Sequence, residues 1–270
     1  MPATIEKSTP EVLLQVTSTG LNWPTPPVFA NKEDERRHLK RRLAAGFRIF
    51  AMHGFDAGIA GHISARDPVL VDHFWVNPLG VHFSRIRVSD LVLIDHHGQV
   101  VEGQHPVNAA AFSIHSRIHR ARPDVVAAAH SHSRYGTAFA SLGRLLPPTT
   151  QEACAFHGDH AVLQAYGGIA SDLSEGDLIA QALGDKKAVI CRNHSHFTVG
   201  HSVDEAVFWF LRMERAFEQY LLAAAVGTPV EIDDATARLT ARQVGSHRAG
   251  WFAMQPLMDK VIAEQPELLD

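Results

Sequence analysis

The stretch His115–Tyr135, which reads HSRIHRARPDVVAAAHSHSRY, restricts the possible folds of this chain more than any other. Its apolar run from Val125 to Ala129 has the length of a short buried strand. His130 and His132 follow, and residues two apart in a strand project from the same face, so both imidazoles can converge on one ion. In a helix they would diverge. The pattern predicts a strand ending in a metal-binding pair; the alternative is two polar residues that only mark the strand's end.

Length and composition favour one α/β domain and exclude some classes of partner. A chain of 270 residues can bury a sizeable core. A net charge of −4 gives no basic surface for nucleic acid, and no apolar stretch approaches the ~20 residues that span a bilayer. The two cysteines, Cys154 and Cys191, form no CxxC motif, and no basic-then-apolar leader begins the chain. We therefore expect a cytoplasmic protein that binds neither nucleic acid nor membrane.

The composition changes along the chain and suggests three parts. Residues 1–30 are rich in proline and read as a flexible N-terminal arm. Residues 31–230 form the predicted metal-binding domain, which begins with an amphipathic helix ending at Gly54. Residues 231–270 are a C-terminal extension that we expect to pack on the domain or on a neighbouring subunit. The long helix from Asp204 to about Ala225 before it is apolar over much of its circumference and should be buried or interfacial.

Other histidines and one acid are weaker candidates for chemistry. His96 and His97 lie at the tip of a predicted hairpin and should be solvated. His115 and His119 are four apart on a helix capped by Asn108, and we expect one to be buried and the other exposed. After the strand predicted from Val125, Ser133 is expected to cap the next helix. Further on, Glu152 is a conceivable general acid or base.

A second histidine pair supplies the missing third ligand. The segment RNHSHFTVG directly follows a predicted strand, Ala188 to Cys191, and places His194 and His196 at the same two-residue spacing as the first pair. Three histidines are a complete protein ligand set for many catalytic metal ions. The spacing alone does not choose between His194 and His196.

Together, HSRIHRARPDVVAAAHSH and RNHSHFTVG resemble the class II aldolase/adducin family, over about residues 30 to 225. The resemblance implies a three-layer α/β/α sandwich with a mostly antiparallel central sheet, and a homotetramer with active sites near subunit interfaces. It implies that His130, His132 and His194 bind the metal. Because Ser195 stands where the family usually has glycine after that third histidine, His196 is the rival third ligand.

Departures from the family pattern argue against aldolase chemistry. Sugar-phosphate aldolases of the family carry a segment like PSSE, with a serine pair and a catalytic glutamate, where this chain has Ala109, Ala110 and Ala111. The GNIS segment appears as Gly61-His62-Ile63-Ser64. A methyl group cannot transfer the proton that an aldolase must move. Either Glu152 has taken this role or the chemistry differs; a non-catalytic, adducin-like scaffold is an alternative, but it would not need three converging histidines.

Three histidines leave a divalent metal at its full charge with open positions, for Zn²⁺ as a Lewis acid or for Fe(II) with a 2-oxo acid and O₂. Apolar Ala109 to Phe112 and Phe197 favour an aromatic, non-phosphorylated substrate. The chain is similar to non-haem iron oxygenases of novobiocin-type aminocoumarin biosynthesis. This implies two oxidative decarboxylations, from a prenylated 4-hydroxyphenylpyruvate through the mandelate to 3-dimethylallyl-4-hydroxybenzoate. The alternative is a Zn-dependent aldolase or decarboxylase. Candidates for substrate contact or support of the metal ligands are His62, His115, Tyr135, Gln151 and His196.

Overall fold

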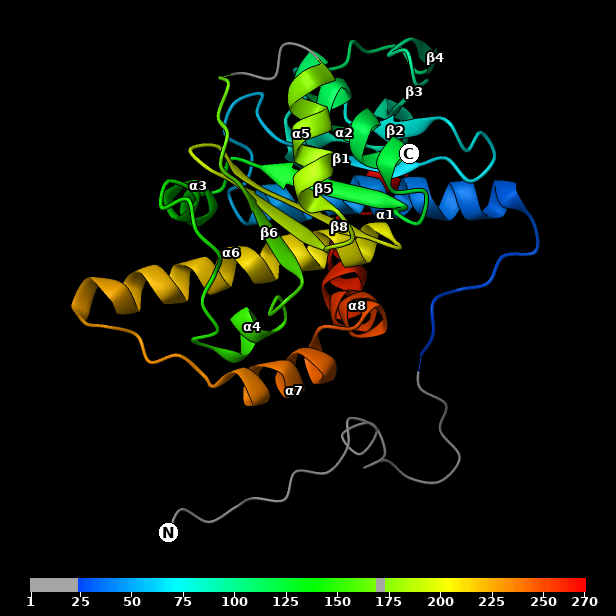
Figure 1. Ribbon diagram of the computed structural model, residues 1–270. Helices are drawn as coiled ribbons and strands as arrows, with labels where there is room; N and C mark the ends of the chain where they lie inside the picture. The colour runs from blue at the N-terminus through cyan, green and yellow to red at the C-terminus, as the bar shows by residue number, and fades with distance from the viewer. Residues whose placement is uncertain (1–23, 169–172) are drawn as a thin grey trace, which may run out of the picture.

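Eight strands form one sheet at the centre of the computed structural model, which describes residues 24–168 and 173–270 (Figure 1). The strands are β1 (His62–Arg66), β2 (Phe74–Val76), β3 (Val92–Ile94), β4 (Val100–Glu102), β5 (Ala127–Ser131), β6 (His160–Leu163), β7 (Ala188–Cys191) and β8 (Ser195–Gly200). Their spatial order is β4-β3-β2-β1-β5-β8-β7-β6, and every neighbouring pair is antiparallel except β6 and β7. The expected mostly antiparallel sheet is confirmed.

Helices cover both faces of this sheet. They are α1 (Lys32–Met52), α2 (Ala109–Ala121), α3 (Arg134–Ala140), α4 (Gln151–Cys154), α5 (Leu173–Leu183), α6 (Val203–Val226), α7 (Asp234–Val244) and α8 (His247–Glu264), with short 3₁₀ helices at Phe83–Arg85, Val88–Asp90 and Pro266–Leu269. Helices α2 and α5 pack on one face, while α1, α6 and α8 share a core with the other. This is the predicted three-layer α/β/α sandwich.

Strand β5 lies in the middle of the sheet and is buried along its whole length. Its alternation turns Ala127 and Ala129 toward α1 and α6, and turns Ala128 toward α2 and α5. Alanine is small enough for helical layers to approach closely on both faces. His130 continues the side of Ala128, so its imidazole enters the layer between the sheet and α2.

Several local predictions are confirmed and one is wrong. As predicted, the side chain of Asn108 caps α2 by accepting a hydrogen bond from the Ala110 amide; Asn31 caps α1 in the same way. The hairpin of β3 and β4 exposes His96 and His97 at its turn. Ser133 precedes α3 but does not cap it with its side chain, because its hydroxyl donates to Glu214 at 2.5 Å instead.

The chain ends on the same side of the sheet as α1 and α6. Helix α8 packs against both, and α7 packs against α4. Most of the predicted N-terminal arm, residues 1–23, lies outside the described residues. Within the described part of the chain, none of the helices combines the length and apolarity needed to cross a bilayer.

A histidine–carboxylate contact fastens the start of α8 to α6. Nδ1 of His247 lies 2.5 Å from Oε1 of Glu205, whose carboxylate is almost fully buried and also accepts from Trp209 Nε1 at 2.8 Å. The hydrogen bond to Glu205 raises the pKa of His247 above its usual value. The folded state therefore binds the His247 proton more tightly than the unfolded state does.

This contact predicts a loss of stability as the pH rises. Its contribution is complete below the unfolded histidine pKa of about 6.5 and disappears as the pH rises through the higher folded value. We expect the thermal unfolding midpoint to fall over this range, and to fall less in His247→Gln. Differential scanning calorimetry at a series of pH values measures both slopes. Equal slopes in the two proteins would contradict the prediction.

Candidate metal centre

Three histidines from two distant segments meet at one end of the sheet. His130 is on β5, His132 follows the last residue of that strand, and His194 lies in the turn between β7 and β8. Their candidate ligand atoms all lie within 4.8 Å of one another, and Nε2 of His132 is 3.0 Å from Nε2 of His194. The segments meet because β5 and β8 are neighbours, with His130 paired to Phe197. We call His130, His132 and His194 the histidine cluster.

The ring of His130 is held in one orientation. Its Nδ1 lies 2.9 Å from the backbone carbonyl of His196. A carbonyl can only accept, so Nδ1 carries the proton and Nε2 keeps a free lone pair. The ring also stacks on Phe197, with centroids 3.9 Å apart and planes at 8°. Partners of this kind fix the tautomer and direction of a metal-binding histidine.

Burial keeps the histidine cluster neutral. It lowers the pKa of His194 to about 4, with a smaller effect from His132, and it lowers the pKa of His132. Burial lowers the pKa of His130 well below its usual value, and the neighbouring imidazoles add to this. Metal ligation requires unprotonated nitrogen, so these donors are ready at neutral pH. Three neutral imidazoles suit a divalent first-row metal such as Fe²⁺ or Zn²⁺.

The side chain of His196, the rival third ligand, points to the opposite face of the sheet. Its ring stacks on Phe210 of α6 with centroids 4.1 Å apart, and it also contacts Phe217. Burial lowers its pKa to about 3. The structure therefore does not bring this imidazole to the histidine cluster, and His196 contributes only its backbone carbonyl, as acceptor for His130.

Two further predicted residues, His62 and His115, lie between the sheet and α2, on the same face of the sheet as His130. His62 pairs with His130 across β1 and β5, and their ring centroids are 5.4 Å apart. His115 of α2 is 5.2 Å from His62, with its Nδ1 2.6 Å from Ser64 Oγ. His119 also reaches Ser64, at 2.8 Å, and is only 4% exposed. The expectation that one of the α2 histidines is exposed is wrong, because both rings are buried and one nitrogen of each contacts Ser64.

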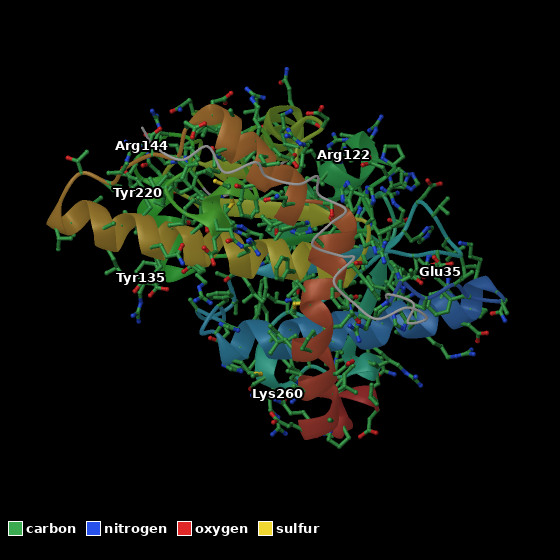
Figure 2. All side chains as sticks on the ribbon, turned by 90° about the horizontal axis from the view of Figure 1, so that it is seen from below. Glu35, Arg122, Tyr135, Arg144, Tyr220 and Lys260 are labelled. Carbon is green, nitrogen blue, oxygen red and sulfur yellow. The ribbon has the colours of Figure 1, made fainter. Side chains whose placement is uncertain are left out.

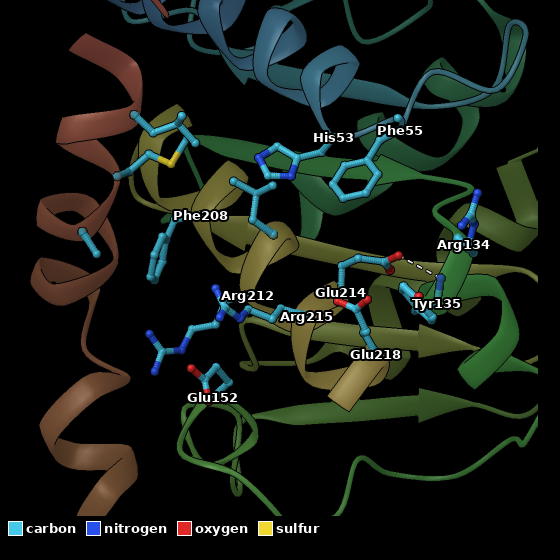
Figure 3. Close-up of a pocket in the computed structure, with 15 residues that line it drawn as sticks. His53, Phe55, Arg134, Tyr135, Glu152, Phe208, Arg212, Glu214, Arg215 and Glu218 are labelled. Carbon is cyan, nitrogen blue, oxygen red and sulfur yellow. Dashed lines mark hydrogen bonds between the residues drawn. The ribbon is translucent and has the colours of Figure 1, made fainter. Parts of the chain in front are cut away.

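Tyr135 and Gln151 do not reach the histidine cluster. Tyr135 lines a cavity of about 680 Å³ along α6 and α8, where Figure 3 shows it beside Glu214 and Glu218. Gln151 is exposed on α4, a helix that packs against α6 and α7. Glu152 lines the same cavity near Arg212. The structure therefore does not place Glu152 where it could replace the missing aldolase acid.

Glu214 is a functional candidate that the sequence did not reveal. It is 6% exposed on α6, and its carboxylate accepts hydrogen bonds from the Ser133 hydroxyl and the backbone amides of Tyr135 and Gly136. These groups form the start of α3, immediately after His132. Glu214 thereby holds the backbone that carries this ligand. Burial raises its pKa.

The fold and histidine cluster can be compared with known proteins. A family model described as Class II Aldolase and Adducin N-terminal domain matches residues 41–221. The chain belongs to this family. It is 45% identical to "Decarboxylase NovR" of Streptomyces niveus over 245 residues, which are 90% of this chain and 91% of the relative.

Two other members of the family are similarly close. One, from Streptomyces roseochromogenus subsp. oscitans, is named "4-hydroxy-3-prenylphenylpyruvate oxygenase/4-hydroxy-3-prenylbenzoate synthase"; it is 44% identical over 90% of this chain and 88% of its own. The other is a solved structure, "L-fuculose 1-phosphate aldolase from Glaciozyma antarctica PI12", with a TM-score of 0.85 and 45% identity over 91% of this chain and 97% of that one. Relatives of about 45% identity thus include proteins named for different enzyme chemistries.

The start of α2 presents no acid, as the sequence predicts from Ala109, Ala110 and Ala111. Ala111 is 1% exposed and presents only a methyl group one turn before His115. Of the aromatic residues expected nearby, Phe197 stacks on His130, but Phe112 packs with the core of β2 and β3 and against Gly98. The apolar contribution to the histidine cluster therefore comes from β8.

Proposed function

We propose that the protein is an Fe(II)-dependent oxygenase that converts a prenylated 4-hydroxyphenylpyruvate to 3-dimethylallyl-4-hydroxybenzoate through the mandelate. The observation that carries the proposal is the meeting of three neutral histidines, together with a buried alanine, Ala111, and not an acid one turn before His115. A 2-oxo acid needs two open coordination positions and no catalytic glutamate. The name of the Streptomyces roseochromogenus relative supports the substrate class, and the name "Decarboxylase NovR" supports a decarboxylation. A role in aminocoumarin antibiotic biosynthesis is part of the proposal.

In this proposal the residues of the chain bind the metal ion, orient its ligands and contact the substrate. His130, His132 and His194 would hold the metal, and Fe(II) would supply the redox chemistry by chelating the 2-oxo acid and reducing O₂. Phe197 and the His196 carbonyl keep His130 aligned. His62 lies next to His130, is buried, and has a free Nδ1 that can hydrogen-bond a substrate oxygen. The homotetramer implied by the family remains a prediction.

The proposed reaction has a fixed stoichiometry. An arylpyruvate and O₂ give the arylmandelate and CO₂, and the mandelate with a second O₂ gives the benzoate, CO₂ and water. We expect the anaerobically purified protein, loaded with Fe(II), to consume one O₂ for each CO₂ released from the prenylated arylpyruvate. An oxygen electrode and trapping of labelled CO₂ measure both quantities. Absence of O₂ uptake and CO₂ release would rule out the oxygenase.

A divalent-metal aldolase or decarboxylase, with Zn²⁺ as the natural ion, is the second candidate. The aldolase name of the Glaciozyma structure, which is 45% identical to this chain, favours it. It predicts carbon–carbon cleavage that needs Zn²⁺ but no O₂. If the protein retained no metal with either ion yet still assembled, an adducin-like scaffold would be the better description.

A further inference from the structure

A second cavity lies at the end of α2 that is remote from the histidine cluster. It has a volume of about 630 Å³ and is bounded by the last turns of α2 and by the end of β1 with the turn into β2. The histidine cluster lies near His62, at the start of β1, whereas this cavity is bordered by Arg66 at the other end of the strand. The two are separate sites on the same face of the sheet.

Three buried polar atoms on the wall of this cavity have no hydrogen-bond partner among the described residues. They are Nδ1 of His73, Oγ of Ser116 and Nδ1 of His119. The side chains of Ser116 and His119 are at least nine-tenths buried. Buried polar groups without partners are costly, so a cluster of them around a cavity indicates a polar ligand. Each of the three can donate a hydrogen bond.

The charges around the cavity are mostly positive. Arg66, Arg117 and Arg120 line it, against the single described acid Asp72. Arg117 has an ion pair with Asp177, while Arg120 has none among the described residues. Among the described residues, the guanidinium of Arg66 donates only to backbone carbonyls, those of Val71, His119, Arg122 and Val125. Its positive charge is therefore not paired with a carboxylate there.

Apolar side chains form the rest of the cavity wall and would contact an apolar part of the ligand. Val71, Phe74, Pro123 and Leu173 lie beside the donors. Cavities of a few hundred Å³ that combine apolar walls with a few convergent polar groups suit small organic molecules. Donors and positive charge select a negatively charged acceptor. We propose that this cavity binds a small organic carboxylate, and that its binding sets the tautomer of His115 through Ser64.

The coupling follows from one shared proton. Ser64 Oγ lies 2.8 Å from Nε2 of His119 and 2.6 Å from Nδ1 of His115. A hydroxyl has one hydrogen, so Ser64 donates to one imidazole and accepts from the other. Burial lowers the pKa of both histidines to about 3, so both rings are neutral.

A carboxylate in the cavity selects one of the two arrangements. It requires a proton on Nδ1 of His119, so Nε2 of that ring must accept from Ser64. Ser64 must then accept from Nδ1 of His115, which leaves Nε2 of His115 without a proton. That atom is buried without a partner in the described part of the chain, and the ring centroids of His115 and His62 are 5.2 Å apart. Occupancy of the remote cavity thereby makes Nε2 of His115, close to His62, a hydrogen-bond acceptor in place of a donor.

Benzoate is a suitable probe, with benzamide as its neutral counterpart. We expect titration calorimetry on the full-length protein to show saturable benzoate binding and none for benzamide. Ser116→Ala should weaken binding about tenfold through loss of one hydrogen bond to a charged group. Ser113→Ala is the matched control, because this serine lies one turn earlier on α2 and does not line the cavity.

Long-range ¹H–¹⁵N correlation spectra of the histidine rings test the coupling. We expect benzoate to move His115 toward the Nδ1-protonated tautomer, and Ser64→Ala to keep benzoate binding but lose this response. Benzoate at the histidine cluster alone would instead give binding that His132→Ala weakens and Ser116→Ala leaves unchanged. That result, or an absence of saturable binding, would overturn the site; an unchanged His115 tautomer in the saturated protein would overturn the coupling.

Discussion

We expect His130→Ala to lose stoichiometric metal and to lower turnover by more than about a hundredfold. His130 is the most constrained of the three candidate ligands, because a backbone carbonyl fixes its tautomer and Phe197 fixes its plane. Two neutral imidazoles would remain, which is one ligand fewer than catalytic sites of this kind use. Metal analysis after anaerobic loading with Fe(II), followed by the oxygen-electrode assay, measures both effects.

Three further substitutions make this result specific. His194→Ala should behave like His130→Ala, whereas His196→Ala should retain metal and lower stability, because its side chain packs on α6 and its carbonyl survives the change. His97→Ala, at the exposed hairpin turn, should change neither. Metal loss in His196→Ala with retention in His194→Ala would show that the assignment of the third ligand is wrong.

The second large effect is expected for Phe197→Ala. Phe197 is fully buried and belongs to the core formed by α2, α5 and the sheet. Deleting a buried phenyl ring costs about 3–5 kcal/mol of unfolding free energy. The same change removes the surface on which His130 stacks, so metal affinity should fall about tenfold as well. Chemical denaturation and metal titration measure the two losses.

Phe197→Leu separates packing from alignment. Leucine fills much of the volume, so the loss of stability should be nearer 1–2 kcal/mol, but it offers no flat ring to the imidazole. We expect metal affinity to fall nearly as much as in Phe197→Ala. If both variants bound metal as tightly as the unmodified protein, the stack would have no part in orienting His130.

Local periodicity was sufficient to predict the parts of the histidine cluster that belong to a strand. The VVAAA run identified β5, and two-residue spacing placed His130 and His132 together. The same spacing left His194 and His196 equivalent, because a spacing rule does not say where a strand begins. In the structure β8 begins at Ser195, so His194 stays in the turn and His196 enters the face covered by α6.

Contacts between distant elements were not accessible from local patterns. Glu214 reads as one polar position on a mostly apolar helix, and only the approach of α6 to α3 turns it into a support for the chain beside His132. Ser64 likewise reads as a small residue in a strand until α2 brings two histidines to it. Tyr135 follows His132 closely in sequence, yet the turn into α3 directs it to another cavity.

The hydrogen bond from His130 to the carbonyl of His196 has an evolutionary consequence. The acceptor is a main-chain atom, so no change of side chain at position 196 can remove it while β5 and β8 stay paired. Position 196 is then free to change without loss of metal binding, provided that the new side chain fills the space beside Phe210 and Phe217. Selection there would act through folding, and selection at position 194 through the reaction.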